Sequence, residues 1–233
     1  MSKNELSAFA APSFTPAIAT KPKQDLDRGY APRLQLVATG NAKVVLEDKA
    51  KAGEFIIVDG ADCTNLGKVV NVVLLGKLFK AVDNSGDDTI VNFDPKSDEY
   101  QSIVAKQKAK GFDSQCMIGP LYLAYNVDNE CFVELYLNSK SAQREEGKLD
   151  AYVPIGPEQA KELGIEPRTP TLATLKSRFI DGKQYKWFVF DTVAGPASLD
   201  GVEPPAAEIV NKACENFYKQ AVVEPVEKES RSR

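Results

Sequence analysis

The sequence contains no histidine and only four cysteines among its 233 residues. Without histidine it lacks the commonest general base near neutral pH, the Ser/His and Cys/His catalytic pairs, and most kinds of zinc site. The four cysteines are too far apart in the sequence for a CxxC pair, which argues against a structural zinc site. We therefore expect neither a cofactor nor a metal, and carboxylates or lysine are the catalytic groups that remain.

Long hydrophobic runs and a strong excess of one charge are also missing. The longest apolar run, Val69–Leu75, is interrupted by Asn71 and is too short for a membrane helix. The N-terminal residues show no apolar stretch typical of a signal peptide, and no N-x-[ST] sequon occurs. A net charge of −4 excludes a histone-like coat on nucleic acid. We expect a cytoplasmic protein with no membrane partner.

The chain divides into a body and two polar ends. Residues 1–30 carry three prolines and mixed charges without periodicity, so we expect a flexible arm. Residues 31–221 are expected to form a single β-rich domain, and residues 222–233 a polar tail.

Apolar and β-branched runs within the body predict strands, and two pairs of them predict hairpins. Leu121–Tyr125 and Cys131–Leu137 flank one turn, while Thr174–Ile180 and Tyr185–Thr192 flank Asp181-Gly182. The other predicted strands are Arg33–Ala38, Glu54–Val58, Val69–Leu75 continuing to Ala81, and Thr89–Phe93. The predicted helices are Asp98–Lys110 with Ser97 as its N-cap, Ser141–Leu149, Glu158–Leu163 and Pro205–Gln220.

This order of elements argues against a doubly wound parallel sheet, because strands and helices do not alternate. It favours a mainly β (α+β) fold. We expect an OB-like antiparallel barrel with helical insertions and a C-terminal helix.

Two motifs with possible chemistry are better explained structurally. The segment from Gly60 to Val69 has six residues between its glycines and lacks the Ser or Thr of a phosphate-binding loop, so we interpret it as a polar turn. The acidic clusters around Asp83 and Asp94 have the composition of a hairpin turn and a helix cap rather than of a metal site.

The most informative segment is 171–190, in which basic and aromatic residues alternate. Its net charge is +3, so the rest of the chain carries −7. A groove for single-stranded nucleic acid needs this combination, because cations follow the phosphates and flat rings stack on bases. We expect phosphate contacts from Lys176, Arg178, Lys183 and Lys186, and stacking on Tyr185 and Trp187, the single tryptophan.

Two weaker patches extend this prediction. Lys77 and Lys80 flank Phe79, a third stacking candidate, and Lys140 and Arg144 lie at the start of a predicted helix. Because residues alternate along a strand, we expect Phe188 and Phe190 to face the core. The alternative to a binding surface is that the lysines on the opposite face form an ordinary solvated surface.

Several segments resemble one family. They are GYAPRLQL (29–36), DPKSDEYQSI (94–103), CMIGPLYLAY (116–125), NSKSAQREEGKL (138–149) and TLKSRFIDGKQYKWFVF (174–190). In these the chain is similar to a group of tailed-bacteriophage proteins described as single-stranded-DNA-binding proteins. The resemblance implies an OB-like phage replication protein that coats single strands without sequence preference. The chain ends in EKESRSR and not in an acidic tail, which speaks against recruitment of partners through the tail.

The sequence therefore predicts a non-enzymatic single-stranded-DNA-binding protein of phage replication or recombination. Its expected partners are single-stranded DNA, further copies of itself and phage replication proteins. The alternative is a structural or regulatory phage module that binds another protein and not nucleic acid. A carboxylate-metal nuclease ranks third.

Overall fold

The computed structural model describes residues 31–111, 114–183, 185–193 and 205–221. The predicted arm (1–30) and tail (222–233) lie outside the described residues.

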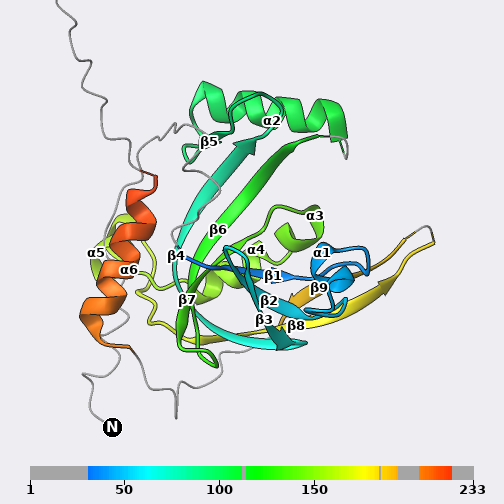
Figure 1. The fold of residues 1–233 in the computed structure, drawn as a ribbon. Helices are drawn as coiled ribbons and strands as arrows, with labels where there is room; N and C mark the ends of the chain where they lie inside the picture. Colours follow the sequence, from blue (N-terminus) through cyan, green and yellow to red (C-terminus); the bar gives the residue numbers. More distant parts are fainter. Residues whose placement is uncertain (1–30, 112–113, 184, 194–204, 222–233) are drawn as a thin grey trace, which may run out of the picture.

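Nine strands of the described part form one sheet (Figure 1). Their order is β3-β2-β1-β7-β6-β4-β8-β9, and β5 pairs with β4 outside this path. The strands are β1 (Arg33–Leu36), β2 (Phe55–Asp59), β3 (Asp62–Gly67), β4 (Val69–Asp83), β5 (Ile90–Asn92), β6 (Cys116–Asn126), β7 (Cys131–Tyr136), β8 (Leu172–Asp181) and β9 (Lys186–Thr192). The helices are α1 (Lys43–Leu46), α2 (Asp98–Lys110), α3 (Lys140–Gln143), α4 (Glu146–Leu149), η4 (Asp150–Tyr152), α5 (Pro157–Leu163) and α6 (Ala207–Lys219).

The mainly β, α+β class is confirmed, but the ladder of the sheet does not close into an antiparallel barrel. One pair is parallel, since Arg33 and Leu34 of β1 lie opposite Glu134 and Leu135 of β7. At the other end of the strand order, β9 meets the segment after β1 through a hydrogen bond from Phe188 N to Ala38 O, 2.8 Å, and through the Phe188 ring, which packs close to Gly53. Because β1 and β9 do not pair as strands, the sheet is curled and open at this seam.

The curled sheet encloses one apolar core on its inner side. Leu34, Phe55, Tyr122, Leu175 and Phe190, from five different strands, are buried together there. The outer side of β4 and β6 is covered by α6, whose Val210, Ala213, Cys214 and Phe217 are buried against these strands. Burying both faces makes β4 and β6 the most apolar strands, as expected for the centre of a sheet.

The helix α2 covers the far ends of β4 and β6 (Figure 1). Ser97 accepts a hydrogen bond from Tyr100 N as N-cap, and Gly111 ends the helix with φ 57°, a left-handed value that glycine tolerates. Tyr100 and Ile103 supply the buried stripe. The predicted bounds of this helix are confirmed, because its start and stop signals are local.

Other predicted elements need correction. The segment interpreted as a polar turn contains β3, which pairs with β2 from Phe55 to Asp59. Its polar residues conceal the strand because β3 is an exposed edge. The single helix predicted over Ser141–Leu149 is two short helices, α3 and α4, separated at Arg144 and Glu145.

Candidate nucleic-acid interface

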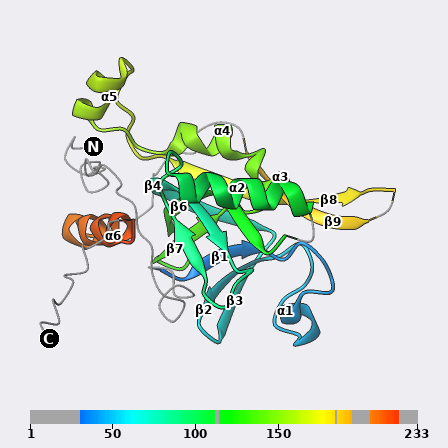
Figure 2. The ribbon, with the colours of Figure 1, turned by 90° about the horizontal axis from the view of Figure 1, so that it is seen from above.

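The β8–β9 hairpin carries most of the predicted site residues and projects beyond the rest of the sheet (Figures 1 and 2). Its register pairs Lys176 with Asp191 and Asp181 with Lys186. Side chains directly opposite one another in an antiparallel pair lie on the same face. Only the first residues of β8 also pair with β4, up to Lys176, so the distal half of the hairpin has no other strand beside it among the described residues.

Carboxylates neutralise part of the positive charge on this hairpin. The Arg178 guanidinium donates from Nε and Nη2 to the two carboxylate oxygens of Asp191. This bidentate contact holds the pKa of the Asp191 carboxyl below its usual range. Lys186 Nζ lies 3.5 Å from a carboxylate oxygen of Asp181. Both pairs are largely exposed, so each contributes little to stability.

Two cations of the hairpin are less constrained. Lys176 and Lys183 are exposed, and within the described residues no carboxylate forms an ion pair with either. Tyr185 at the turn, near Lys183 and Lys186, is 74% exposed, whereas Lys176 lies at the base of the hairpin. An exposed tyrosine ring near exposed lysines is the arrangement that base stacking beside a phosphate backbone requires.

Trp187 is half-buried rather than fully exposed. A Cβ atom added at Gly182 would lie 2.7 Å from Cζ3 of Trp187, so the indole packs closely on the turn of the hairpin. This contact leaves only part of the indole available to a base.

The opposite face of the hairpin holds an aromatic pair that the sequence prediction omitted. The rings of Phe179 and Phe188 lie 5.1 Å apart between centroids, and Phe179 is 48% exposed. Phe190 is buried in the core as predicted, whereas Phe188 is only half-buried. The sequence could have indicated that Phe179 is exposed. Phe179 lies on the same face of β8 as the buried Leu175, but four residues further along, where the strand is no longer buried.

A cavity of about 320 Å³ lies where the sheet stays open, between β9, β1, the end of β7 and α3. Strand residues from Leu34 to Leu36 form one wall and residues from Trp187 to Phe190 the other. Asn138, Ser139 and Ser141 add polar groups at the end of β7 and the start of α3. This cavity could not be predicted from the sequence, because the residues that line it are far apart in the chain.

The second predicted patch is largely engaged in the fold. Lys77 Nζ lies 2.7 Å from Glu146 Oε1 and 2.8 Å from Asp150 Oδ2, and the Lys77 side chain is only 17% exposed. The same ammonium lies 4.7 Å from the centre of the Phe79 ring, which is 39% exposed. Lys80 is half-buried beside the rings of Phe93 and Tyr136. Lys77 therefore attaches α4 and η4 to the sheet and offers little charge to a ligand.

The third patch lies beside the hairpin. Lys140 and Arg144 are exposed, and the neighbouring Ser139 and Ser141 line the same cavity as Trp187. The backbone at the start of α3 is less accessible than predicted, because Ser139 Oγ accepts a hydrogen bond from Ala142 N. The structure thus places the start of α3 beside the hairpin, whereas Lys77 is held in ion pairs with Glu146 and Asp150.

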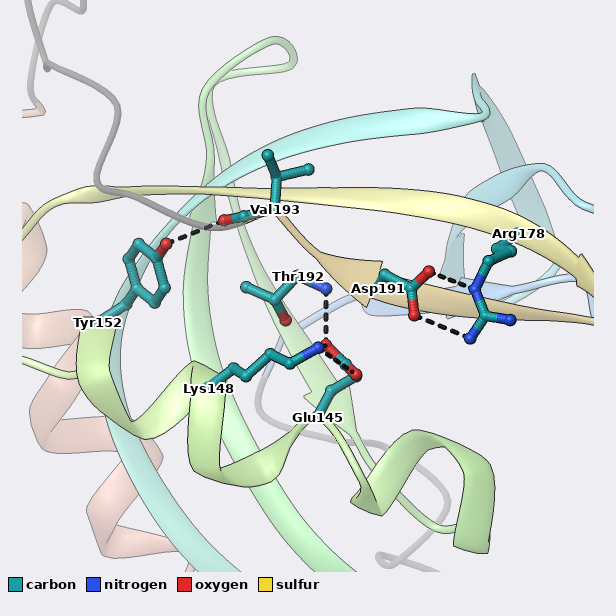
Figure 3. Close-up of polar contacts among 7 residues, drawn as sticks. All are labelled: Glu145, Lys148, Tyr152, Arg178, Asp191, Thr192 and Val193. Carbon is teal, nitrogen blue, oxygen red and sulfur yellow. Dashed lines mark hydrogen bonds and ion pairs between the residues drawn. The ribbon is translucent and has the colours of Figure 1, made fainter.

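A polar clasp holds the base of the hairpin (Figure 3). Glu145 is buried and accepts a hydrogen bond from Thr192 N at 2.7 Å, and Lys148 Nζ lies 2.9 Å from the same carboxylate. The Tyr152 hydroxyl donates to Val193 O at 3.1 Å. These contacts hold the end of β9 against α4 and η4 at the base of the hairpin.

The acidic clusters have the structural roles predicted for them. Asp83 accepts hydrogen bonds from Ser85 N and Oγ and pairs with Lys106 of α2. Burial would raise the pKa of Asp83, but Lys106 and Ser85 outweigh it and bring the pKa well below its usual range. Asp94 accepts from Lys96 N before the cap of α2. In the described ranges no three acidic or cysteine side chains gather in the way that a metal ion needs.

Comparison of the chain with protein-family models, curated proteins and solved structures yields no match. Among the helices of the described residues, none combines the length and the apolar character needed to cross a bilayer.

Proposed function

We propose that this protein binds single-stranded DNA without catalysing a reaction, and that the projecting half of the β8–β9 hairpin is the main contact. The observation that carries the proposal is the exposure of Lys183, Tyr185, Lys186 and Phe179 on the part of the hairpin that extends beyond β4. The exposed Lys176 lies at the base of this part, on the other face. In this proposal the curled sheet serves as an OB-like scaffold, and the protein acts in phage replication or recombination.

The chemistry of the hairpin favours binding with little sequence preference. Lysine ammonium groups contact phosphates, which are the same for every base, and aromatic faces stack on any base. The exposed Lys140 and Arg144 extend the positive surface past the start of α3. Lys77 is not part of the proposed surface, because two carboxylates hold it.

The test compares two triple variants with the same change in net charge. One converts Lys176, Lys183 and Lys186 of the hairpin to glutamate. The matched control converts the exposed Lys96, Lys108 and Lys161, which lie in or beside α2 and α5, to glutamate. Binding of oligo-dT at low salt is followed by mobility shift and by the fluorescence of Trp187.

We expect the hairpin variant to lose at least about tenfold in affinity, since roughly one phosphate contact is lost per lysine, while the control changes little. Circular dichroism and thermal unfolding show whether both variants fold. Failure of the wild-type chain to bind at micromolar protein, or equal losses in both variants, would contradict the proposal.

A second candidate is a protein-interaction module, and one observation favours it. The segment from Ile155 to Arg168 leaves the body and returns through a β-bridge between these two residues, carrying α5 away from the sheet (Figure 2). Leu163 and Ile165 at its end are 60% and 48% exposed. A protein-binding module of this kind predicts indifference to DNA and an oligomer that Leu163→Ser with Ile165→Ser dissociates in light scattering.

A further inference from the structure

The cavity beside β9 has the size and lining of a site for one compact, flat ligand. Its volume of about 320 Å³ lies at the lower end of the range for small-molecule pockets. The lining includes the apolar or aromatic residues Leu36, Trp187 and Phe188. Asn138, which contacts Met117 Sδ, and Ser141, which contacts Ser139 Oγ, keep further capacity to donate and accept hydrogen bonds. Such a lining suits a planar ring with polar edges.

An extended peptide fits this cavity poorly, although an open strand edge lines it. The hydrogen bond from Phe188 N to Ala38 O closes the seam at one point along β9. Further along, Glu145 accepts from Thr192 N. Between these two contacts, only the backbone of β9 around Phe190 is left to pair with a peptide. This stretch is too short for the repeated backbone hydrogen bonds of an added strand.

The position of the cavity connects it to the hairpin. Phe188, which lines the cavity, also contacts Phe179 on the face of the hairpin. The exposed Arg33 and Lys140 lie at or next to residues of the lining, so a phosphate beside the opening meets positive charge. Exposed cations of β1 and α3 thus adjoin the lining of the cavity.

We infer that this cavity receives a single unpaired nucleobase, turned out of a strand that the hairpin holds by its phosphates. The inference rests on the proposed function and adds to it a base-dependent site separate from the exposed Tyr185. The apolar walls take the faces of the base, and the polar groups of Asn138 and Ser141 lie toward its edges.

The test separates the base from the backbone. Two oligomers of equal length are compared with the full chain at low salt, one wholly abasic and one abasic except for a single central thymine. The variant Ser141→Phe places a ring in the cavity, and Asn138→Phe does so from the end of β7 if the first variant does not fold. Ser102→Phe, at an exposed serine of α2, is the matched control.

Stacking of one base predicts a gain of about 5- to 150-fold for the oligomer with thymine. We expect Ser141→Phe to lose this gain while it keeps the affinity for the abasic oligomer, and Ser102→Phe to keep both. If Ser141→Phe retains the gain, the cavity does not hold the base and the proposed function stands.

Two further outcomes are informative. If the wild-type chain binds neither oligomer nor oligo-dT, the proposed function and this inference both fail. If Ser141→Phe changes the oligomeric state while the gain persists, the cavity holds a protein segment, and the inference is overturned without affecting DNA binding.

Discussion

Single side chains set how much of the hairpin's positive charge a ligand meets. Arg178 is one of four cations on the hairpin, yet its guanidinium lies against the Asp191 carboxylate on the neighbouring strand. A phosphate must compete with this carboxylate for the same donors. The three lysines therefore carry more of the proposed interface than their number in the sequence suggests.

This competition makes an unusual prediction at the residue scale. Asp191→Asn removes one negative charge and releases Arg178, so we expect oligo-dT to bind about two- to tenfold more tightly, the range that one added phosphate contact supplies at low salt. Asp128→Asn, at an exposed position in the turn after β6, makes the same charge change outside the hairpin. Fluorescence titration of both variants is the measurement, and equal gains would show that net charge alone is responsible.

Replacing a glycine with alanine should change the free energy of unfolding in opposite directions at two positions. A Cβ at Gly119 of β6 would overlap the carbonyl oxygen of Leu137, whereas a Cβ at Gly147 of α4 meets nothing within 4 Å. We expect Gly119→Ala to lower the free energy of unfolding by about 1–3 kcal/mol through overpacking. Gly147→Ala should raise it by about 0.5–1 kcal/mol, because alanine is the better helix former.

Urea unfolding of the two variants, followed by circular dichroism, measures both effects. A stable Gly119→Ala protein would mean that β6 and the end of β7 can move apart, and the wall of the cavity with them.

At the scale of the elements, buried or half-buried charges attach helices to the sheet. Lys77 joins α4 and η4 to β4, Glu145 joins α4 to β9, and Asp83 joins α2 to β4. Each joint pairs a group on the sheet with a group on a helix far away in the sequence. The helices could slide along apolar surface alone, but these hydrogen-bonded pairs define one position.

The Asp83 joint predicts a pH dependence. Because the pKa of Asp83 is lowered in the folded protein, the unfolded chain binds its proton first as the pH falls. The stabilisation is therefore fully present above about pH 4 and is lost at lower pH. We expect Asp83→Asn to lower the free energy of unfolding at pH 7 by about 1–3 kcal/mol.

The difference between Asp83→Asn and the wild-type protein should shrink as the pH falls below about 4, since Asp83 of the unfolded wild-type chain then takes up a proton while the folded protein keeps it ionised to lower pH. Urea unfolding at several pH values provides the measurement, and Asp88→Asn at an exposed neighbouring position is the control. A difference that stays constant down to pH 2 would contradict an ion-pair role for Asp83.

At the scale of the whole molecule, the net charge of −4 conceals a separation of charge. The segment 171–190 is positive while the rest is acidic. Under the proposed function, we expect this separation to attract a DNA strand to the hairpin and the start of α3 and to repel it from the remaining surface.

The salt dependence of the binding constant tests whether these cations contact phosphates. If three or four cations contact phosphates, the logarithm of the binding constant should fall with the logarithm of salt concentration with a slope of about −2 to −3. Replacing Lys183 with glutamine should make the slope shallower by about 0.7, and the same change at Lys108 should leave it unchanged. Titrations at several salt concentrations measure both slopes. A slope near zero would exclude phosphate contacts as the source of affinity.

Much of the local structure was predictable because its signals lie within a few residues of one another. The helix α2 follows from Ser97, its stripe of apolar residues and Gly111, and both predicted hairpins are confirmed by the pairing of β6 with β7 and of β8 with β9. The exposed edge strand β3 was missed, because a strand that buries neither face shows no alternation.

The sequence shows which kinds of residue the candidate site contains, but it does not show which of them are accessible on the surface. The charge and aromatic content of 171–190 are properties of the sequence alone, and they direct attention to β8 and β9. The availability of those groups depends on partners elsewhere: Lys77 is held by carboxylates 69 and 73 residues away, and Arg178 by Asp191 on the adjacent strand.

The amino-acid sequence excludes histidine chemistry and indicates where the hairpins and longest helices lie and where positive charge is concentrated. The opening of the sheet between β1 and β9, the cavity there and the lysines that face solvent follow from the packing of the folded chain. Turns and helix caps arise from hydrogen bonds between near neighbours. Ion pairs, cavities and the closure of a sheet depend on how distant segments pack, and no local pattern encodes that packing.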